Sequence, residues 1–183
     1  MIKTYIKQIV IILFVVSCGS SKKITEEKQQ NTTTIEVQQK EEVKDIIDNS
    51  KINWLDFETA IEKNKSNKKF IFIDIYTNWC GWCKKMDATT FVNPEVIKYM
   101  NTHFYAVKMD AESKAPIPYK DKLYEWKSYG KRGYNTLAVS LLDAQMSFPS
   151  FVVLSKKETK LGKIVGYKDA NGLLADLKRY VGK

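Results

Sequence analysis

Apolar runs that alternate with helical patterns constrain the fold of this chain more than any other feature. The segments "KKFIFIDIYT" and "FYAVKMDA" are rich in aliphatic and aromatic residues, as is typical of strands buried on both faces of a sheet. Two later segments, "SFPSFVVLS" and "GKIVGY", predict further strands. Four segments predict helices: residues 56–65, 80–91, 93–104 and 169–181. This alternation predicts an α/β fold in which a central sheet carries helices on both faces.

The first residues predict a secretory signal peptide. Lys3 and Lys7 precede an apolar run at residues 9–16, far shorter than the ~20 residues that a membrane-spanning helix needs. The run ends in "VVSC", which resembles the lipobox of bacterial lipoproteins and implies cleavage before Cys18 and acylation of that cysteine. An uncleaved apolar anchor, or an ordinary signal peptide followed by an unrelated cysteine, is the alternative for residues 1–17.

Residues 18–50 predict a lipidated N-terminus followed by a disordered tether. Ser, Thr, Gln, Lys and Glu dominate them and no aromatic residue occurs, so they have little apolar surface to bury. We expect the globular domain at residues 51–183. The lipobox resemblance implies a lipid-anchored protein of the bacterial cell envelope, with the bilayer as a partner. No acidic residue follows Cys18 closely, which favours the periplasmic face of the outer membrane.

The chain is basic, with a formal net charge of +9 from 30 Lys and Arg against 21 Asp and Glu. An excess of this kind can serve nucleic-acid or anionic membrane binding. Here the lysines are mixed with acidic residues and no run of five basic residues occurs. The charge pattern therefore predicts a solvated surface and no nucleic-acid partner.

Two of the three cysteines stand three residues apart in "WCGWCKK". At a strand-to-helix junction, Cys80 would lie in the first helical turn, where free amides and the helix dipole stabilise a thiolate. Cys83 would lie one turn on, within the ~4.4–6.8 Å Cα separation of a disulfide. We expect Cys80 to be the exposed nucleophile and Cys83 the thiol that resolves a mixed disulfide.

Other uses of this cysteine pair fit less well. Zinc needs four ligands, and the chain has no second pair and a single histidine, His103. A structural disulfide across three residues would constrain little of the unfolded chain. Dithiol exchange is the remaining interpretation, and it predicts no metal.

The stretch "FIDIYTNWCGWCKK" resembles the active-site region of the thioredoxin superfamily, and looks closest to exported bacterial proteins of the disulfide-interchange type. The resemblance covers about residues 52–183 and implies a thioredoxin fold with a central mixed sheet. It extends beyond the cysteines. Asp74 matches the buried carboxylate of the family, and Lys108 matches the lysine that approaches this carboxylate from the next strand. Trp79 matches the tryptophan before the nucleophile, Pro149 the cis-proline, and Gly166 the glycine before the last helix.

The resemblance implies a thiol:disulfide oxidoreductase without metal or organic cofactor, acting through a redox-active Cys80–Cys83 disulfide. Asp74 would accept the proton of Cys83, or would be a buried acid without a catalytic part. The implied partners are proteins with disulfides and a membrane electron-transfer protein that restores the dithiol. Five residues would contact the substrate: Trp79, Gly81, Trp82, Phe148 and Pro149.

The direction of exchange follows from the residues between the two cysteines. Gly81-Trp82 places no histidine there, which favours a reductant over an oxidase or isomerase. A non-catalytic binding module on the same scaffold remains open, because a fold alone does not define a function.

Residues 111–148 form an insertion before the proline loop, longer than the minimal connection of the family. It holds a predicted helix at residues 135–144 and five aromatic residues: Tyr119, Tyr124, Trp126, Tyr129 and Tyr134. Such an insertion could recognise a partner near the site, or could pack onto the sheet and extend the core.

Overall fold

The computed structural model describes residues 50–182 of the chain. The predicted signal peptide, Cys18 and the tether up to residue 49 lie outside the described residues and stay predictions. In the part of the chain that the structure describes, no helix combines the length and apolar character that crossing a membrane requires.

Five strands form the central sheet, in the order β1-β3-β2-β8-β9. Strands β1 and β2 run parallel to β3, whereas β8 runs antiparallel to both β2 and β9. The sheet is therefore mixed, as predicted. Its strands are β1 (Trp54–Leu55), β2 (Phe70–Tyr76), β3 (Phe104–Asp110), β8 (Ser150–Leu154) and β9 (Lys160–Val165).

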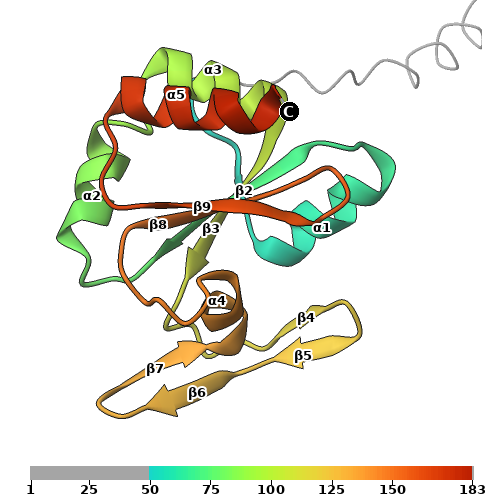
Figure 1. Ribbon diagram of the computed structural model, residues 1–183, viewed down its shortest axis with the longest axis vertical. Helices are drawn as coiled ribbons and strands as arrows, with labels where there is room; N and C mark the ends of the chain where they lie inside the picture. Colours follow the sequence, from blue (N-terminus) through green and yellow to red (C-terminus); the bar gives the residue numbers. More distant parts are fainter. Residues whose placement is uncertain (1–49, 183) are drawn as a thin grey trace, which may run out of the picture. The chain divides into compact units, whose positions relative to one another are not determined.

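Helices cover both faces of this sheet, again as predicted (Figure 1). Successive side chains of β2 point to opposite faces of the sheet, so Ile71, Ile73 and Ile75 face one side and Phe72 faces the other. The hydrophobic core is therefore divided into two clusters, one on each face of the sheet. The isoleucine side packs against α1 (Phe57–Ser66) and α4 (Thr136–Leu141). The Phe72 side packs against α2 (Gly81–Ala88), α3 (Pro94–His103) and α5 (Ala170–Val181).

The helix starts follow from capping residues in the sequence. Asp56 caps α1 by accepting a hydrogen bond from the Thr59 amide at 2.7 Å. Asn93 caps α3, whose first residue is Pro94. Two predicted helices are shorter than expected, since Thr89 ends α2 and the left-handed conformation of Asp143 and Ala144 follows α4.

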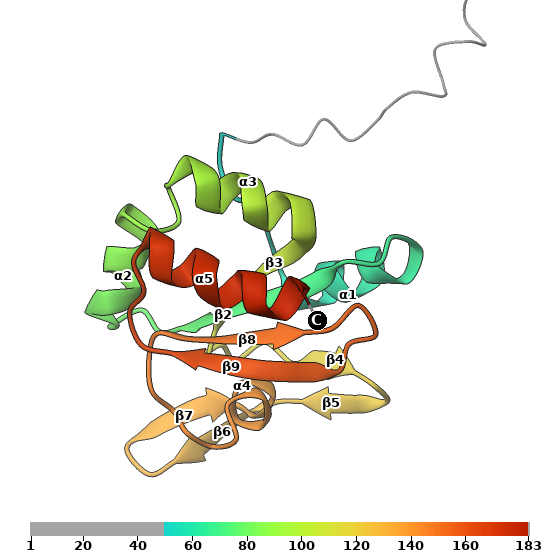
Figure 2. The ribbon, with the colours of Figure 1, turned by 45° about the horizontal axis from the view of Figure 1, so that its top comes forward.

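The insertion forms two hairpins that the sequence analysis missed. Strands β4 (Ile117–Tyr119) and β5 (Lys122–Tyr124) make the first, and β6 (Trp126–Tyr129) and β7 (Arg132–Asn135) make the second. Figures 1 and 2 show both hairpins and α4 on the side of the sheet opposite to α3 and α5.

Part of the insertion extends the core. Tyr119 meets Phe57 edge to face, with ring centroids 5.0 Å apart, and Tyr134 is buried in the cluster beneath the isoleucines of β2. Tyr124 packs against the same cluster, while Tyr129 is exposed. The packing interpretation therefore holds for three of these tyrosines.

Candidate active site

Cys80 and Cys83 form a disulfide at the N-terminus of α2, with their Cα atoms 5.3 Å apart. Cys80 is the N-cap residue of this helix, and its Sγ accepts a hydrogen bond of 3.1 Å from the Cys83 amide. The strand-to-helix junction predicted from the sequence therefore exists. It directs a first-turn amide at the sulfur of Cys80.

One expectation about these cysteines is wrong. Cys80 is not exposed, because only 4% of it is accessible in this oxidised form, nearly the same as the 3% of Cys83. The capping position explains this, since the Cys80 sulfur turns back over the first helical turn instead of pointing outward. Their difference in this structure lies in hydrogen bonding and not in exposure.

A buried ion pair lies between strands β2 and β3. Asp74 is 1% exposed and pairs in register with Lys108, whose Nζ lies 2.8 Å from Asp74 Oδ2. Asp74 Oδ1 finds no hydrogen-bond partner among the described residues. Burial raises the pKa of Asp74 from 3.8 to about 6, against the opposing effect of Lys108.

Lys108 connects this carboxylate to the helix that carries Cys83. Its ammonium also pairs with Asp87 of α2 and lies over the rings of Trp54 and Tyr76, 5.1 Å from each centroid. Burial lowers the pKa of Lys108, but its two carboxylate partners outweigh this and leave the pKa raised. Asp87 was not predicted from the sequence, although it lies one turn after Cys83 on the same face of α2.

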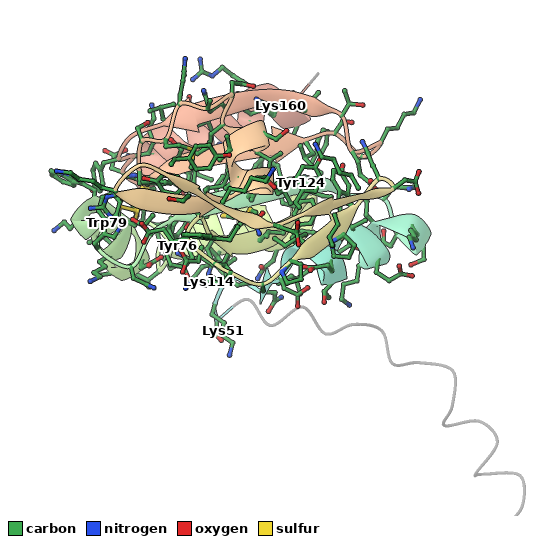
Figure 3. All side chains as sticks on the ribbon, turned by 90° about the horizontal axis from the view of Figure 1, so that it is seen from below. Lys51, Tyr76, Trp79, Lys114, Tyr124 and Lys160 are labelled. Atoms are coloured by element: carbon green, nitrogen blue, oxygen red, sulfur yellow. A yellow bond between two sulfur atoms is a disulfide. The ribbon has the colours of Figure 1, made fainter. Side chains whose placement is uncertain are left out.

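Exposed tryptophans border the disulfide. Trp79, just before Cys80, is 50% exposed, and Trp82, between the two cysteines, is 60% exposed. The ring of Trp79 meets Phe148 edge to face at 5.7 Å, and that of Trp82 lies 5.3 Å from Tyr167. Figure 3 looks onto the hairpin side and shows Trp79 at the end of the molecule beside α2.

The proline loop has the predicted conformation. The Phe148–Pro149 peptide bond is cis, and the Pro149 carbonyl accepts a hydrogen bond of 2.9 Å from the amide of Gly166. Trp79 contacts Phe148 directly, so the loop and the tryptophan before Cys80 meet. A side chain at Gly81 would meet no atom within 4 Å, so the backbone between the cysteines faces open space.

Three further residues of this region escaped the sequence analysis: Glu112, Arg132 and Tyr167. Arg132 lies over the Trp79 ring, 4.1 Å from its centroid, and Glu112 accepts a hydrogen bond of 3.1 Å from the Trp79 indole. Arg132 and Glu112 come from the insertion, far from Trp79 in sequence, and no local pattern marks them. No group of ligands suited to a metal ion occurs among residues 50–182.

Solved structures with the same arrangement are thioredoxin-fold proteins. A structure titled "DsbH Oxidoreductase" matches with a TM-score of 0.51 at 20% identity, over 72% of this chain and 85% of that chain. A thioredoxin from Thermus thermophilus matches with a TM-score of 0.52 at 14% identity, over 71% and 87%. At these identities the matches establish the fold, and the predicted thioredoxin fold is confirmed.

Curated relatives share only one segment with this chain. An uncharacterized protein of Caenorhabditis elegans is 36% identical over 77 residues, which are 42% of this chain and 10% of the relative. Spermatogenesis-associated protein 20 of Mus musculus is 31% identical over 74 residues, or 40% and 9%. The chain thus spans about a tenth of the length of these relatives.

The sequence profile of one protein family covers more than half of the chain. It matches residues 34–162, a range that includes the cysteine pair, the ion pair and the proline loop. With the fold and this match together, the chain belongs to the Thioredox_DsbH family, described as a protein of unknown function, DUF255, within the thioredoxin-fold superfamily.

Proposed function

We propose that this protein is a thiol:disulfide oxidoreductase that reduces disulfides of other envelope proteins with Cys80 and Cys83. The observation that carries the proposal is the hydrogen bond from the Cys83 amide to the sulfur of Cys80 at the start of α2. In the reduced protein the same amide and the helix dipole would stabilise a thiolate on Cys80, and the thiolate is the nucleophilic form of cysteine.

The exchange proceeds in two displacements. The Cys80 thiolate attacks one sulfur of the substrate disulfide, forms a mixed disulfide and expels the other substrate sulfur as a thiolate. The Cys83 sulfur, deprotonated, then attacks Cys80 and releases the second substrate thiolate, which leaves the Cys80–Cys83 disulfide seen here. Two electrons pass to the substrate, and a membrane electron-transfer protein returns two electrons to the pair.

Asp74 is the proposed acceptor of the Cys83 proton. Its pKa of about 6 lies near neutral pH, which suits a general base, and Oδ1 has no hydrogen-bond partner within the described chain. Lys108 supports this role because it holds the carboxylate through Oδ2 and is itself tied to α2 through Asp87.

The substrate would lie in extended form along Phe148 and Pro149, between the exposed rings of Trp79 and Trp82. Within the described chain the backbone amide and carbonyl of Phe148 have no hydrogen-bond partner, so they are available to a strand added alongside. The backbone at Gly81 leaves room for this strand to approach the disulfide. No organic cofactor or metal is needed for the exchange.

Insulin reduction tests the proposal. The protein, recharged by dithiothreitol, should accelerate precipitation of the insulin B chain, and the Cys80→Ser variant should not exceed the rate of dithiothreitol alone. Equal rates with and without the wild-type protein would favour a binding module that does not turn over. Acceleration that survives Cys80→Ser would contradict the assigned nucleophile.

We further propose that the mature protein begins at an acylated Cys18 and lies on the periplasmic face of the outer membrane. Support comes from the sequence alone: the lipobox-like "VVSC" and the absence of an acidic residue close behind it. Mass spectrometry of the membrane-extracted protein should find lipid mass on the peptide that starts at Cys18. An unmodified Cys18 within a longer N-terminal peptide would contradict the anchor.

A further inference from the structure

A row of aromatic rings runs from the active site into the second hairpin of the insertion. It starts at Trp79, continues to Phe148 at 5.7 Å, then to Tyr134 at 6.2 Å, and ends at Tyr129, another 6.2 Å on. Tyr134 is buried, while Trp79 at one end and Tyr129, 47% exposed, at the other are open to solvent. The row thus joins the residue before Cys80 to the tip of the β6–β7 hairpin.

The hairpin is also fixed to the site by charge. Arg132 of β7 lies over the Trp79 ring, 4.1 Å from its centroid, and its Nη1 lies 3.3 Å from Glu112 Oε1. The other oxygen of Glu112 accepts the indole N–H of Trp79 at 3.1 Å. These three side chains close a ring of contacts, so the hairpin and Trp79 have a defined relative position.

The strand register decides which hairpin residues share the site's side. Lys127 pairs with Tyr134, and Tyr129 pairs with Arg132, so all four side chains lie on one face of the hairpin. On the opposite face the Trp126 ring covers Gly133, where an added Cβ would come within 1.8 Å of the ring. The face that contacts Trp79 and Phe148 is therefore the one that carries Lys127 and Tyr129.

This hairpin is cationic as well as aromatic. Residues 126–135 include Lys127, Lys131 and Arg132 and no acidic residue, and Glu125 lies just before them. Arg132 is engaged by Glu112, whereas Lys127 and Lys131 make no ion pair within residues 50–182. Both lysines are exposed, so their charge is available to a bound partner.

We propose that the β6–β7 hairpin docks the polypeptide that flanks the substrate cysteine, and that it favours flanks carrying acidic residues. This inference rests on the proposed function, because it extends the substrate surface of the same dithiol. Aromatic rings offer rigid apolar contact area. Lys127 and Lys131 attract carboxylates, and the exposed rings of Trp79 and Tyr129 offer contacts at the two ends of the path from the disulfide to the hairpin.

Two peptides with the same disulfide test the preference, one flanked by several glutamates and the other by several lysines. The reduced full-length protein should reduce the glutamate peptide with a kcat/KM about fivefold higher at low salt, given the modest strength of exposed ion pairs. The ratio should shrink as NaCl is raised, because exposed charges are screened. The double variant Lys127→Ala/Lys131→Ala should bring the ratio close to one.

A matched control removes two exposed lysines elsewhere. Lys98→Ala/Lys157→Ala, on α3 and on the turn between β8 and β9, changes the net charge equally and should keep the wild-type ratio. Equal rates on both peptides for the wild type, or an undiminished ratio in the Lys127→Ala/Lys131→Ala variant, would overturn the proposal.

Binding separates this proposal from the proposed function. Affinities for the same peptides with serine in place of cysteine report docking without chemistry, and the glutamate peptide should bind more tightly by a similar factor. A binding preference without reduction of either peptide or of hydroxyethyl disulfide would refute the enzymatic function while supporting the docking surface. Reduction of hydroxyethyl disulfide with no binding preference would support the enzymatic function and refute the docking surface.

Discussion

Lys108 Nζ lies 2.8 Å from Asp74 Oδ2, and the two residues are register neighbours on adjacent strands of the sheet. The pair does not fully offset the burial of the carboxylate, because the pKa of Asp74 rises from 3.8 to about 6. Asp74 therefore has a proton affinity suited to exchange near neutral pH. The ionised carboxylate also has an energetic cost to the folded state, and this cost leads to the first prediction.

Replacing Asp74 by Asn should stabilise the oxidised protein at pH 8. A folded-state pKa above the ordinary value means that the folded protein binds this proton more tightly than the unfolded chain. Its contribution to stability is present below about pH 4 and is lost as pH rises through about 6. The full shift, which already includes the attraction of Lys108, corresponds to on the order of 3 kcal/mol. We expect a smaller gain of about 1–2 kcal/mol, because the amide group of Asn must also find hydrogen-bond partners in this buried site.

Urea unfolding at pH 4 and at pH 8 measures this effect. The wild type should lose stability between the two pH values, and Asp74→Asn should lose less. Asp121→Asn is the control, since Asp121 is exposed in the β4–β5 turn and Asn tolerates its left-handed backbone. If Asp74→Asn is less stable than the wild type at pH 8, the prediction is wrong and the ionised carboxylate stabilises the fold.

Lys108→Met should shift the pH dependence of disulfide reduction upward. If Asp74 must be ionised to accept the Cys83 proton, kcat/KM rises with pH through the pKa of Asp74. Removing the ammonium leaves burial unopposed and should move this midpoint up by about one pH unit or more.

Asp87→Asn provides a matched test of opposite sign. The charge of Asp87 raises the pKa of Asp74, so its removal should move the same midpoint slightly down. Both variants disturb the contacts of Lys108, so a merely structural effect would lower kcat/KM in each without separating the midpoints. Midpoints that coincide in all three proteins would rule out Asp74 as the base.

Cys83→Ser should accumulate mixed disulfides with partner proteins, and Cys80→Ser should not. The amide of Cys83 supports a thiolate on Cys80, and the serine amide at position 83 still offers this support. Without the Cys83 sulfur the mixed disulfide cannot be resolved. Non-reducing gels of each variant, compared with reduced samples, count the trapped species. Trapping by Cys80→Ser alone would reverse the assignment.

Strands β2, β3 and β8 of the central sheet were predictable because they coincide with apolar runs in the sequence. The five buried residues in the middle of β2 are an example. By contrast, β1 has two residues, and β4 and β5 have three each, so tertiary pairing decides them more than local pattern. Lys120 and Asp121 form the turn between β4 and β5 in left-handed conformations. No glycine at these positions indicated the turn in the sequence.

The site was predictable where its residues keep fixed spacing in sequence. Cys80, Cys83 and Asp74 lie on one strand-to-helix unit, and Lys108 follows from the neighbouring strand. Arg132 and Glu112 were not predictable as site residues, because their contact with Trp79 depends on how the insertion folds back onto the site. The near-equal burial of the two cysteines depends on side-chain direction within one helical turn, which spacing alone does not define.

The reduction potential of the Cys80–Cys83 pair should lie below glutaredoxin values of about −200 to −230 mV, toward the thioredoxin value of about −270 mV. A cation between the cysteines would stabilise the thiolate and make the pair more oxidising, and Gly81-Trp82 supplies none. The carboxylate of Asp74 disfavours a second negative charge, and Lys108 offsets only part of this effect.

Trp82→His should therefore raise the potential, while Trp82→Phe, which keeps a ring without a charge, should raise it much less. Trp82 is 60% exposed, so neither change opens the core. Equilibration with glutathione and dithiothreitol buffers measures all three proteins, and a wild-type potential above about −180 mV would replace the proposed reductant by an oxidase or isomerase.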